Sequence, residues 1–334
     1  MIISWNTTKR CNLYCKHCYR DSDTKPMYDE LSTKEGLKLI EEIKEAGFKI
    51  LILSGGEPLI RDDIEIFAKK ACEIGLMPVL GTNATLIDKK RAKSLKEAGI
   101  KACAVSIDSV DEKKHDNFRG KEGSFKAALR GIKNLKDVGI RVQINSTIRK
   151  DNLHEIEALN EFAIENKASS HHPFFLVKTG RGLNIGDVFL DEDEYTKAIE
   201  EIIKLSKKSK IELKPTCAPQ FMVEAKKQNI NMRFSRGCIA GTKYCCILPN
   251  GDVHICPYAP IKVDNIRINT FDYIWKHNDI FLELRDFDKY KGVCKNCKNI
   301  NICGGCRARA YEETNDYMEG DSICKLKKNW RDLN

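Results

Sequence analysis

Short apolar runs alternate with amphipathic segments over about the first 178 residues of the chain. Such runs are typical of buried strands, and the segments between them repeat apolar residues at helical spacing. The strand candidates are Ile2–Trp5, Ile50–Leu53, Pro78–Gly81, Ala102–Ile107, Val142–Thr147 and Pro173–Val177. The helix candidates are Thr33–Ala46, Asp62–Ile74, Asp88–Ala98, Ser124–Val138 and Leu153–Asn166. This alternation predicts an α/β fold with parallel strands in an open or partial barrel, with ligands at the carboxyl ends of the strands.

The pattern changes in the last third of the chain. Residues 191–209 predict one more helix, and from about Lys214 the chain is rich in Cys, Gly and Asn. A short helix is expected at Phe271–Asp286 in this region. We therefore predict a barrel over residues 1–210 and a separate cysteine-rich region over residues 211–334.

The composition limits the cellular location and the partners that can be expected for the protein. The 334 residues are 42% hydrophobic, which is enough for a sizeable core, and the formal net charge is +9. Lysines alternate with glutamates on the predicted helix faces, so this excess is read as solvated surface, and no nucleic-acid partner is predicted. No apolar stretch approaches the length of a membrane span, and polar residues begin at Ser4. The expectation is a cytoplasmic protein without a membrane partner.

Fifteen cysteines are the anomaly in this composition. In a cytosolic chain such a number indicates metal or redox chemistry rather than disulfides. Cys72 and Cys103 stand apart on apolar faces and are expected to be inert core thiols. Ten others lie from Cys217 onward, and three lie near the amino terminus.

Those three, Cys11, Cys15 and Cys18, occur in the run C-N-L-Y-C-K-H-C-Y after the first predicted strand. Thiolates are soft ligands that suit iron–sulfur clusters and zinc. Three thiolates on one loop would leave one iron of a cubane cluster free to bind a reactive ligand. A zinc site completed by His17 is the alternative, although His17 directly abuts Cys18 and adjacent residues rarely bind one metal together.

Glycine and polar residues follow the second, third and fourth predicted strands. They are Gly55, Gly56 and Glu57, then Thr82 and Asn83, then Ser106, Asp108 and Arg119. A hydroxyl, a carboxylate and a guanidinium at successive strand ends suit a zwitterionic ligand that carries a ribose. Each element alone is ambiguous, because Gly-Gly at a strand end is often only a turn.

With these residues in place, the chain resembles the radical S-adenosylmethionine (SAM) enzymes, whose signature is C-x3-C-x2-C after the first strand of a partial (β/α)6 barrel. The resemblance covers residues 1 to about 180. It implies that Cys11, Cys15 and Cys18 hold a [4Fe–4S] cluster whose open iron binds the amino and carboxylate groups of SAM. The further SAM contacts that it implies are Gly55, Gly56, Glu57, Ser106 and Arg119, with Tyr19 near the adenine and Asn83, Asp108 and Asn145 as looser candidates.

The cysteines of the last third resemble the SPASM extension, which binds one or two auxiliary iron–sulfur clusters. By this resemblance, one auxiliary [4Fe–4S] cluster would be held by Cys294, Cys297, Cys303 and Cys324. The other would be held by Cys238, Cys256 and Cys306, with either Cys217 or Cys245 as the fourth ligand. The chain departs from the usual pattern in the spacing of Cys303 and Cys306 and in the extra pair Cys245 and Cys246. Zinc bound by the two C-x2-C pairs is the alternative for this region.

Three stretches, His171–Gly182, Ile211–Phe221 and Cys303–Tyr311, look like the branch of the family that modifies tetrapyrroles. The whole chain is similar to the SAM-dependent heme synthases of the siroheme-dependent pathway, and its start close to the cysteine motif favours that group. The resemblance implies conversion of two propionates of iron-coproporphyrin III to vinyl groups, with a low-potential donor such as ferredoxin or flavodoxin. Candidate partners for the substrate carboxylates are Arg149, Lys178, Arg181 and Lys214. His171 and His172 are candidates to ligate heme iron or to move a proton.

Three alternatives stay open from the sequence. One is the didecarboxysiroheme deacetylase of the same pathway, and another is a SPASM enzyme that modifies peptides. The third is a cluster protein that only transfers electrons, although the SAM-site residues would then have no purpose.

Overall fold

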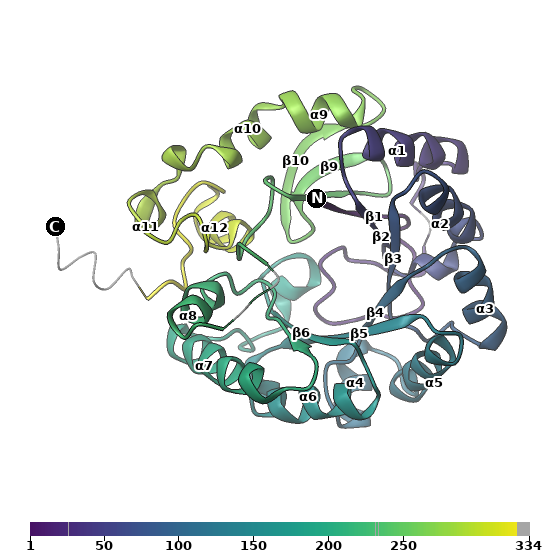
Figure 1. Ribbon diagram of the computed structural model, residues 1–334, viewed down its shortest axis with the longest axis horizontal. Coiled ribbons are helices and arrows are strands. Elements are labelled where there is room, and N and C mark those ends of the chain that lie inside the picture. Colours follow the sequence, from purple (N-terminus) through teal and green to yellow (C-terminus); the bar gives the residue numbers. More distant parts are fainter. Residues whose placement is uncertain (26, 231, 233, 326–334) are drawn as a thin grey trace.

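The computed structural model describes residues 1–25, 27–230, 232 and 234–325, in which ten strands form one curved sheet with helices around its outside (Figure 1). The strand order is β10-β9-β8-β1-β2-β3-β4-β5-β6-β7. Strands β1 to β7 pair in parallel in chain order, β8 pairs in parallel with β1 on its other side, and β9 runs antiparallel to both β8 and β10. The expected α/β fold with a partial barrel is confirmed.

The strands are β1 (Ile2–Asn6), β2 (Ile50–Ser54), β3 (Met77–Thr82), β4 (Ala102–Ser106), β5 (Arg141–Ile148), β6 (Ser170–Phe175), β7 (Glu212–Leu213), β8 (Tyr244–Ile247), β9 (Asp252–Cys256) and β10 (Ala259–Asn265). The barrel helices are α1 (Thr33–Glu45), α2 (Ile64–Glu73), α3 (Lys89–Glu97), α4 (Glu112–Arg119), α5 (Ser124–Asp137), α6 (Ile156–Glu165) and α7 (Glu192–Lys208). The later helices are α8 (Phe221–Lys227), α9 (Phe271–His277), α10 (Asp279–Arg285), α11 (Gly292–Lys295) and α12 (Arg307–Thr314). Every barrel strand and helix that the sequence predicted is present. The largest shifts are of three residues, since β6 begins at Ser170 instead of Pro173 and α6 begins at Ile156 instead of Leu153.

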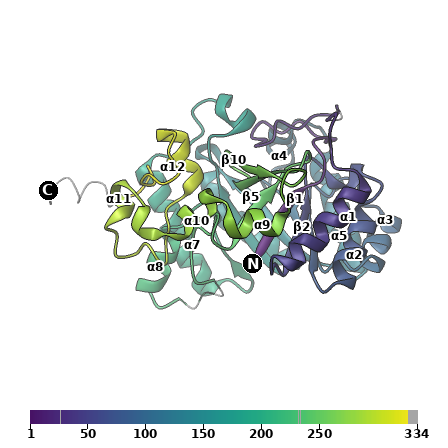
Figure 2. The ribbon, with the colours of Figure 1, turned by 90° about the horizontal axis from the view of Figure 1, so that it is seen from above.

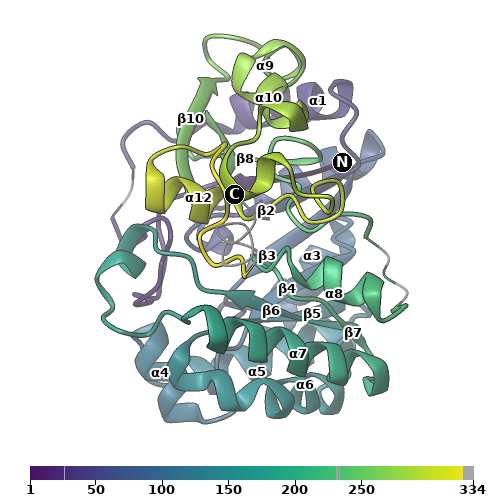
Figure 3. The same cartoon turned by 90° about the vertical axis from the view of Figure 1, so that its left-hand side faces the viewer.

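The cysteine-rich region is built onto the edge of the barrel sheet. Strand β8 pairs in parallel with β1, so the sheet continues without a break from the barrel into β8–β10. Helix α9 packs against α1, and α12 packs against β10 (Figures 2 and 3). The proposed division at residues 210 and 211 stays a prediction, and residues 231, 233 and 326–334 of the second region lie outside the described residues.

Two predictions for single elements were wrong in detail. The helix expected at Phe271–Asp286 is two helices, because Asn278 has an extended backbone and its side chain caps α10 at the Ile280 N–H. Cys72 is exposed rather than part of the core, whereas Cys103 is fully buried as expected. Cys72 lies near the end of α2 beside Gly99, which has no side chain to cover it.

The hydrophobic core lies between the outer face of the sheet and the helices that cover it. Trp5 of β1 is fully buried and packs on Phe67 of α2, with ring centres 4.7 Å apart. A methyl group at Gly36 of α1 would lie 2.5 Å from the Trp5 ring and 2.6 Å from that of Phe67. The absence of a side chain at Gly36 therefore lets α1 approach the sheet closely.

We expect Gly36→Ala to lower the free energy of unfolding by about 1–2 kcal/mol. Because both ring contacts would be shorter than 3 Å, crowding should cost about 2–3 kcal/mol, the upper part of the usual range, and the better helix propensity of alanine returns only about 1 kcal/mol. Denaturant unfolding of the anaerobically purified protein measures this, with Lys34→Ala on the exposed face of α1 as the control. A Gly36→Ala protein as stable as the wild type would contradict this packing.

Candidate active site at the mouth of the barrel

The three amino-terminal thiols lie together on the loop that follows β1. Cys11 and Cys15 are buried in one small cluster with Leu13, and Cys18 packs against it. Each sulfur accepts one hydrogen bond, from Leu13 N–H at 3.5 Å, Arg119 Nη1 at 3.8 Å and Ser22 N–H at 3.4 Å, respectively. Such N–H···S bonds are a main means by which a protein tunes an iron–sulfur cluster.

The electrostatics of the loop also fit a metal cluster. Burial raises the pKa of the Cys11 thiol to about 12 and also raises that of Cys15. These thiols favour their neutral form unless a bound cation deprotonates them, and a coordinated metal does so. The ring of His17, the residue of the zinc alternative, stacks on the ring of Phe118 with ring centres 4.3 Å apart, and its Nε2 lies 3.3 Å from Thr147 Oγ1.

Arg181 fastens the cysteine loop to the segment after β6. Its Nε donates to the Cys15 carbonyl at 3.0 Å, and its Nη1 donates to Ser22 O and Asp21 Oδ1, both at 2.8 Å. The guanidinium also lies over the ring of Tyr14, 3.9 Å from its centre. In the described structure Arg181 therefore braces the loop.

The Gly55-Gly56-Glu57 segment after β2 packs directly on the same loop. A methyl group at Gly55 would lie 2.7 Å from the Thr8 carbonyl oxygen, and one at Gly56 would lie 2.3 Å from that of Arg10. Gly56 N–H donates to Thr8 O and Glu57 N–H donates to Arg10 O, both at 2.8 Å. Both glycines are thus required by the close approach of two backbones.

Glu57 is fully buried and joins β2 to the end of β3. Its carboxylate accepts from Thr82 Oγ1 and Asn83 N–H, both at 2.8 Å, and from Leu59 N–H at 3.2 Å. Burial raises the pKa of Glu57 to about 7 in spite of these donors. Asn83 in turn donates to Asn12 of the cysteine loop at 2.9 Å.

Asp108 and Arg119 form a buried ion pair beneath Cys15. Arg119 Nε lies 2.6 Å from Asp108 Oδ2, and both side chains are at most 9% exposed. The guanidinium holds the pKa of Asp108 well below its usual range despite the cost of burial. Because Arg119 also donates to the Cys15 sulfur, the pair links the end of β4 to the thiol cluster.

We expect Asp108→Asn to lower the free energy of unfolding by about 3–5 kcal/mol, because it leaves the Arg119 charge buried without its partner. Denaturant unfolding under anaerobic conditions measures the loss. The control is Asp137→Asn, which removes only a surface contact with Lys133 and should leave the midpoint unchanged. Equal midpoints for the two variants would refute a structural role for the pair.

The two candidate histidines on β6 face opposite sides of the sheet. His171 is fully buried among the outer core, with its Nε2 3.1 Å from Ser146 Oγ. His172 is partly exposed and lies in register with Asn145 of β5, which is in register with Ser106 of β4. Burial lowers the pKa of both histidines to about 3. The structure thus places Ser106, Asn145 and His172 in one row on the inner face, and His171 away from it.

The three remaining residues proposed to bind substrate carboxylates each have other partners in the structure. Arg149 makes a bidentate pair with Asp151, at 2.7 and 3.1 Å. Lys178 lies 4.0 Å from both Glu312 and Glu313 of α12. Lys214 lies over the Phe234 ring, and burial lowers its pKa to about 8.

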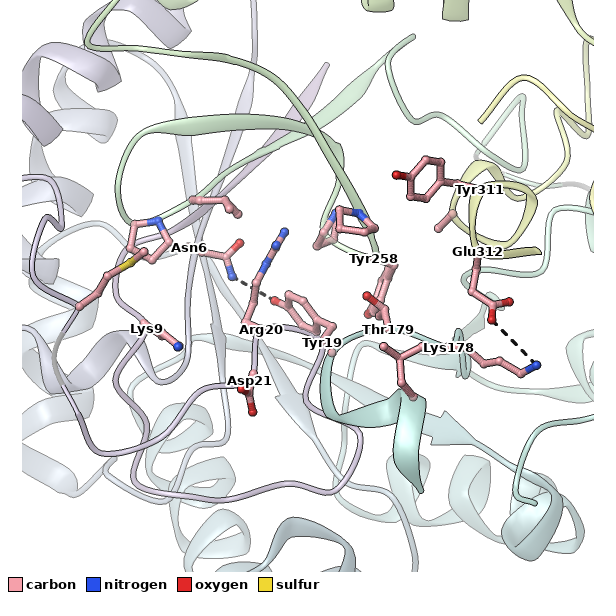
Figure 4. Close-up of a pocket in the computed structure, with 18 of the residues that line it drawn as sticks. Asn6, Lys9, Tyr19, Arg20, Asp21, Lys178, Thr179, Tyr258, Tyr311 and Glu312 are labelled. Carbon is pink, nitrogen blue, oxygen red and sulfur yellow. Dashed lines mark hydrogen bonds and ion pairs between the residues drawn. The ribbon is translucent and has the colours of Figure 1, made fainter. Parts of the chain in front are cut away.

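A pocket of about 460 Å³ opens beside the cysteine loop (Figure 4). Its walls come from the cysteine loop, the segment after β6, the β9–β10 hairpin and α12, and so from both ends of the chain. Tyr19 lines it, accepts a hydrogen bond from Asn6 Nδ2 at 3.2 Å, and contacts Tyr258 with ring centres 5.1 Å apart. The volume is within the usual range of small-molecule sites.

Four later thiols gather near Tyr258, which also lines the pocket. Cys217 and Cys306 share a hydrogen bond, Cys256 interacts electrostatically with Cys238 and Cys306, and Tyr258 interacts with Cys217 and Cys256. This set, Cys217, Cys238, Cys256 and Cys306, is called cysteine set 1 below. The sequence left the fourth member of this set open between Cys217 and Cys245, and in the structure Cys217 lies with the other three.

The adjacent pair Cys245 and Cys246 points to opposite faces of β8. Cys245 lies in the outer core and interacts with Arg285. Cys246 is in register with Ser4 on the inner face, and its thiol donates to Asn6 Oδ1 at 2.9 Å.

A second group of thiols lies around the start of α12. Cys303 interacts electrostatically with Cys294 and Cys324, and Gly305 N–H donates to its sulfur at 3.4 Å. Cys294 lies on α11, Cys297 follows just after the end of this helix, and the Cys297 N–H donates to the Cys294 carbonyl at 3.3 Å. This group, Cys294, Cys297, Cys303 and Cys324, is called cysteine set 2.

Two buried arginines of α12 donate hydrogen bonds to members of these two sets. Arg307 Nη2 donates to Cys294 Sγ at 3.5 Å, and Arg309 pairs with Asp321 at 2.7 Å and donates to the Cys217 carbonyl at 3.1 Å. Buried cations beside thiols favour the thiolate form. Both sets therefore fit the negative charge of thiolate-ligated iron–sulfur clusters.

The fold and the three-thiol loop define a radical SAM enzyme with an auxiliary-cluster domain, and comparison with known proteins agrees. Residues 5–163 match the radical SAM superfamily, and residues 238–298 match the SPASM iron–sulfur cluster-binding domain. The chain belongs to the SPASM-bearing radical SAM family that includes the AdoMet-dependent heme synthases. As a member it uses a [4Fe–4S] cluster, SAM and auxiliary iron–sulfur clusters. The zinc alternatives are thereby overturned.

Three relatives cover nearly the whole chain. It is 39% identical to an AdoMet-dependent heme synthase of Methanosarcina barkeri, over 97% of this chain and 95% of the relative. It is 35% identical to one from Nitratidesulfovibrio vulgaris, over 98% of this chain and 92% of the relative. An Fe-coproporphyrin III synthase of Methanosarcina barkeri is 31% identical, over 98% of this chain and 88% of that protein.

Solved structures support the fold. SuiB of Streptococcus suis bound to S-adenosylmethionine superposes with a TM-score of 0.77 at 19% identity, over 97% of this chain and 77% of SuiB. Within the described residues, no helix is both long and apolar enough to cross a membrane.

Proposed function

We propose that this enzyme converts two propionate side chains of iron-coproporphyrin III to vinyl groups, giving heme b. One observation carries the proposal: the chain is 39% and 35% identical over nearly its full length to proteins named heme synthase. The relative named for making Fe-coproporphyrin III is 31% identical. We also expect the enzyme to work in the cytoplasm, where its thiols stay reduced.

The proposed reaction balances in atoms and electrons. A hydrogen atom leaves the β-carbon of the propionate, CO2 then leaves, the vinyl double bond forms, and one electron is released. When bound, the cluster at Cys11, Cys15 and Cys18 supplies a 5′-deoxyadenosyl radical from SAM. In our proposal the chain's contribution is placement, because the pocket walls bring the substrate next to Tyr19 at the end of the cysteine loop.

The electron released at each step needs an acceptor near the pocket. Tyr258 lines the pocket and lies next to Cys217 and Cys256 of cysteine set 1. We therefore assign cysteine set 1 to the nearer auxiliary cluster and cysteine set 2 to the outer one. A ferredoxin or flavodoxin would supply the low-potential electron that starts SAM cleavage.

Anaerobic incubation of the reconstituted enzyme with SAM, dithionite and iron-coproporphyrin III tests the proposal. We expect 5′-deoxyadenosine together with the monovinyl compound and then heme b, separated by chromatography. Didecarboxysiroheme is the parallel substrate, because the Fe-coproporphyrin III synthase is the second candidate from the comparisons. Deacetylation of that compound, with no vinyl product from the first, would replace the proposed function by the second candidate.

A further inference from the structure

Arg20 extends from the cysteine loop into the pocket, two residues after Cys18 (Figure 4). Its Nη2 donates to the Cys246 sulfur at 3.7 Å, and its guanidinium carbon lies 5.3 Å from the centre of the Tyr19 ring. Its Nε is shielded from solvent and has no hydrogen-bond partner within the described residues. Among those residues Arg20 also forms no ion pair with a carboxylate.

The other charges around Arg20 do not compensate it. Asp21, the next residue, pairs with Arg181 at 2.8 Å. Glu312 across the pocket lies 4.0 Å from Lys178. A partly buried guanidinium without an anion is costly, and a missing partner at this position indicates an anionic ligand. The planar fork of donors on arginine matches a carboxylate best.

We propose that Arg20 binds the carboxylate of the propionate that reacts; this role rests on the proposed function. Arg20 lies on the loop that carries the three thiols, so a propionate held there has its β-carbon at the cysteine-loop end of the pocket. When CO2 leaves, the anion that Arg20 held is gone and a neutral vinyl group remains. The grip is then lost, and the ring is free to turn and present its second propionate.

This inference predicts a binding pattern that a structural role for Arg20 would not produce. In the reconstituted enzyme without SAM, Arg20→Gln should weaken binding of iron-coproporphyrin III by about 10–100-fold, the usual loss for a hydrogen bond to a charged group. Binding of heme b, which lacks the two reacting carboxylates, should change little. Arg20→Lys should restore part of the affinity for iron-coproporphyrin III, because it keeps the charge and loses the fork.

Absorbance titration in the Soret band measures both affinities. The control is Arg130→Gln, which removes an equal charge from the exposed face of α5. Unchanged affinity for iron-coproporphyrin III in Arg20→Gln, or an equal loss for heme b, would overturn the inference.

The same samples separate this inference from the proposed function. Vinyl product from the wild type with unchanged substrate affinity in Arg20→Gln would overturn the role of Arg20 alone. Tight, Arg20-dependent binding of iron-coproporphyrin III without vinyl product would overturn the reaction alone and keep the carboxylate site. A wild-type enzyme that does not bind iron-coproporphyrin III would overturn both.

Discussion

Cys11→Ser should abolish the cleavage of SAM, so that no 5′-deoxyadenosine forms in the presence of dithionite. Cys11 is one of three thiols that share one buried cluster, and each of the three sulfurs already has its own hydrogen-bond donor. Serine has no soft ligand atom, and iron–sulfur clusters are held by thiolates. With two ligands left, the cluster that activates SAM should not assemble.

Quantification of 5′-deoxyadenosine by chromatography after anaerobic reconstitution tests this. The matched control is Cys72→Ser, since Cys72 is exposed and lies outside both cysteine sets. SAM cleavage by Cys11→Ser at the rate of the control would show that the three-thiol loop does not hold the cluster that cleaves SAM.

Cys217→Ser should lose vinyl formation while it still cleaves SAM, whereas Cys245→Ser should retain both. Cys217 shares a hydrogen bond with Cys306 and lies close to Cys256, within cysteine set 1. Cys245 lies in the outer core beside Arg285, and among the described residues it interacts with no member of cysteine set 1. Its neighbour Cys246 is the residue that interacts with Cys256. Loss of one ligand of the nearer cluster should remove the electron acceptor and leave the SAM-binding cluster intact.

Iron content and products together measure this prediction. Cys217→Ser should contain about four irons fewer per chain than the wild type, the content of one [4Fe–4S] cluster. Cys245→Ser is the matched control, because it changes the same atom in the same region. Full iron content and vinyl product from Cys217→Ser, with a loss in Cys245→Ser, would reverse the assignment.

The barrel was predictable because its signals are local. The short apolar runs of the strands and the 3.6-residue repeat of the helices can each be recognised within a short window, and glycine follows four of the five predicted barrel helices. Helix α4 was missed because Phe118 is the one large apolar residue in its sequence E-K-K-H-D-N-F-R. Strands β8 and β9 are short, but Asn250-Gly251 between them is a recognised hairpin signal that could have revealed them.

The site was predictable only in part, because faces and partners are set by tertiary structure. His171 and His172 are adjacent on a strand, so the register of β6 decides which one faces inward. Cys217 joins Cys238, Cys256 and Cys306 across a long stretch of chain, and spacing carries no information on that meeting. Arg20 looks like an ordinary loop arginine in the sequence, and only its lack of an acidic partner in the pocket distinguishes it.

The central claim, that the radical takes hydrogen from a substrate propionate, is tested most directly by isotope transfer. Iron-coproporphyrin III with deuterium at the propionate β-carbons should give 5′-deoxyadenosine that carries deuterium, together with vinyl product and CO2. Mass spectrometry of the 5′-deoxyadenosine measures the label in a single anaerobic incubation. Unlabelled 5′-deoxyadenosine with all four propionates intact would contradict the account.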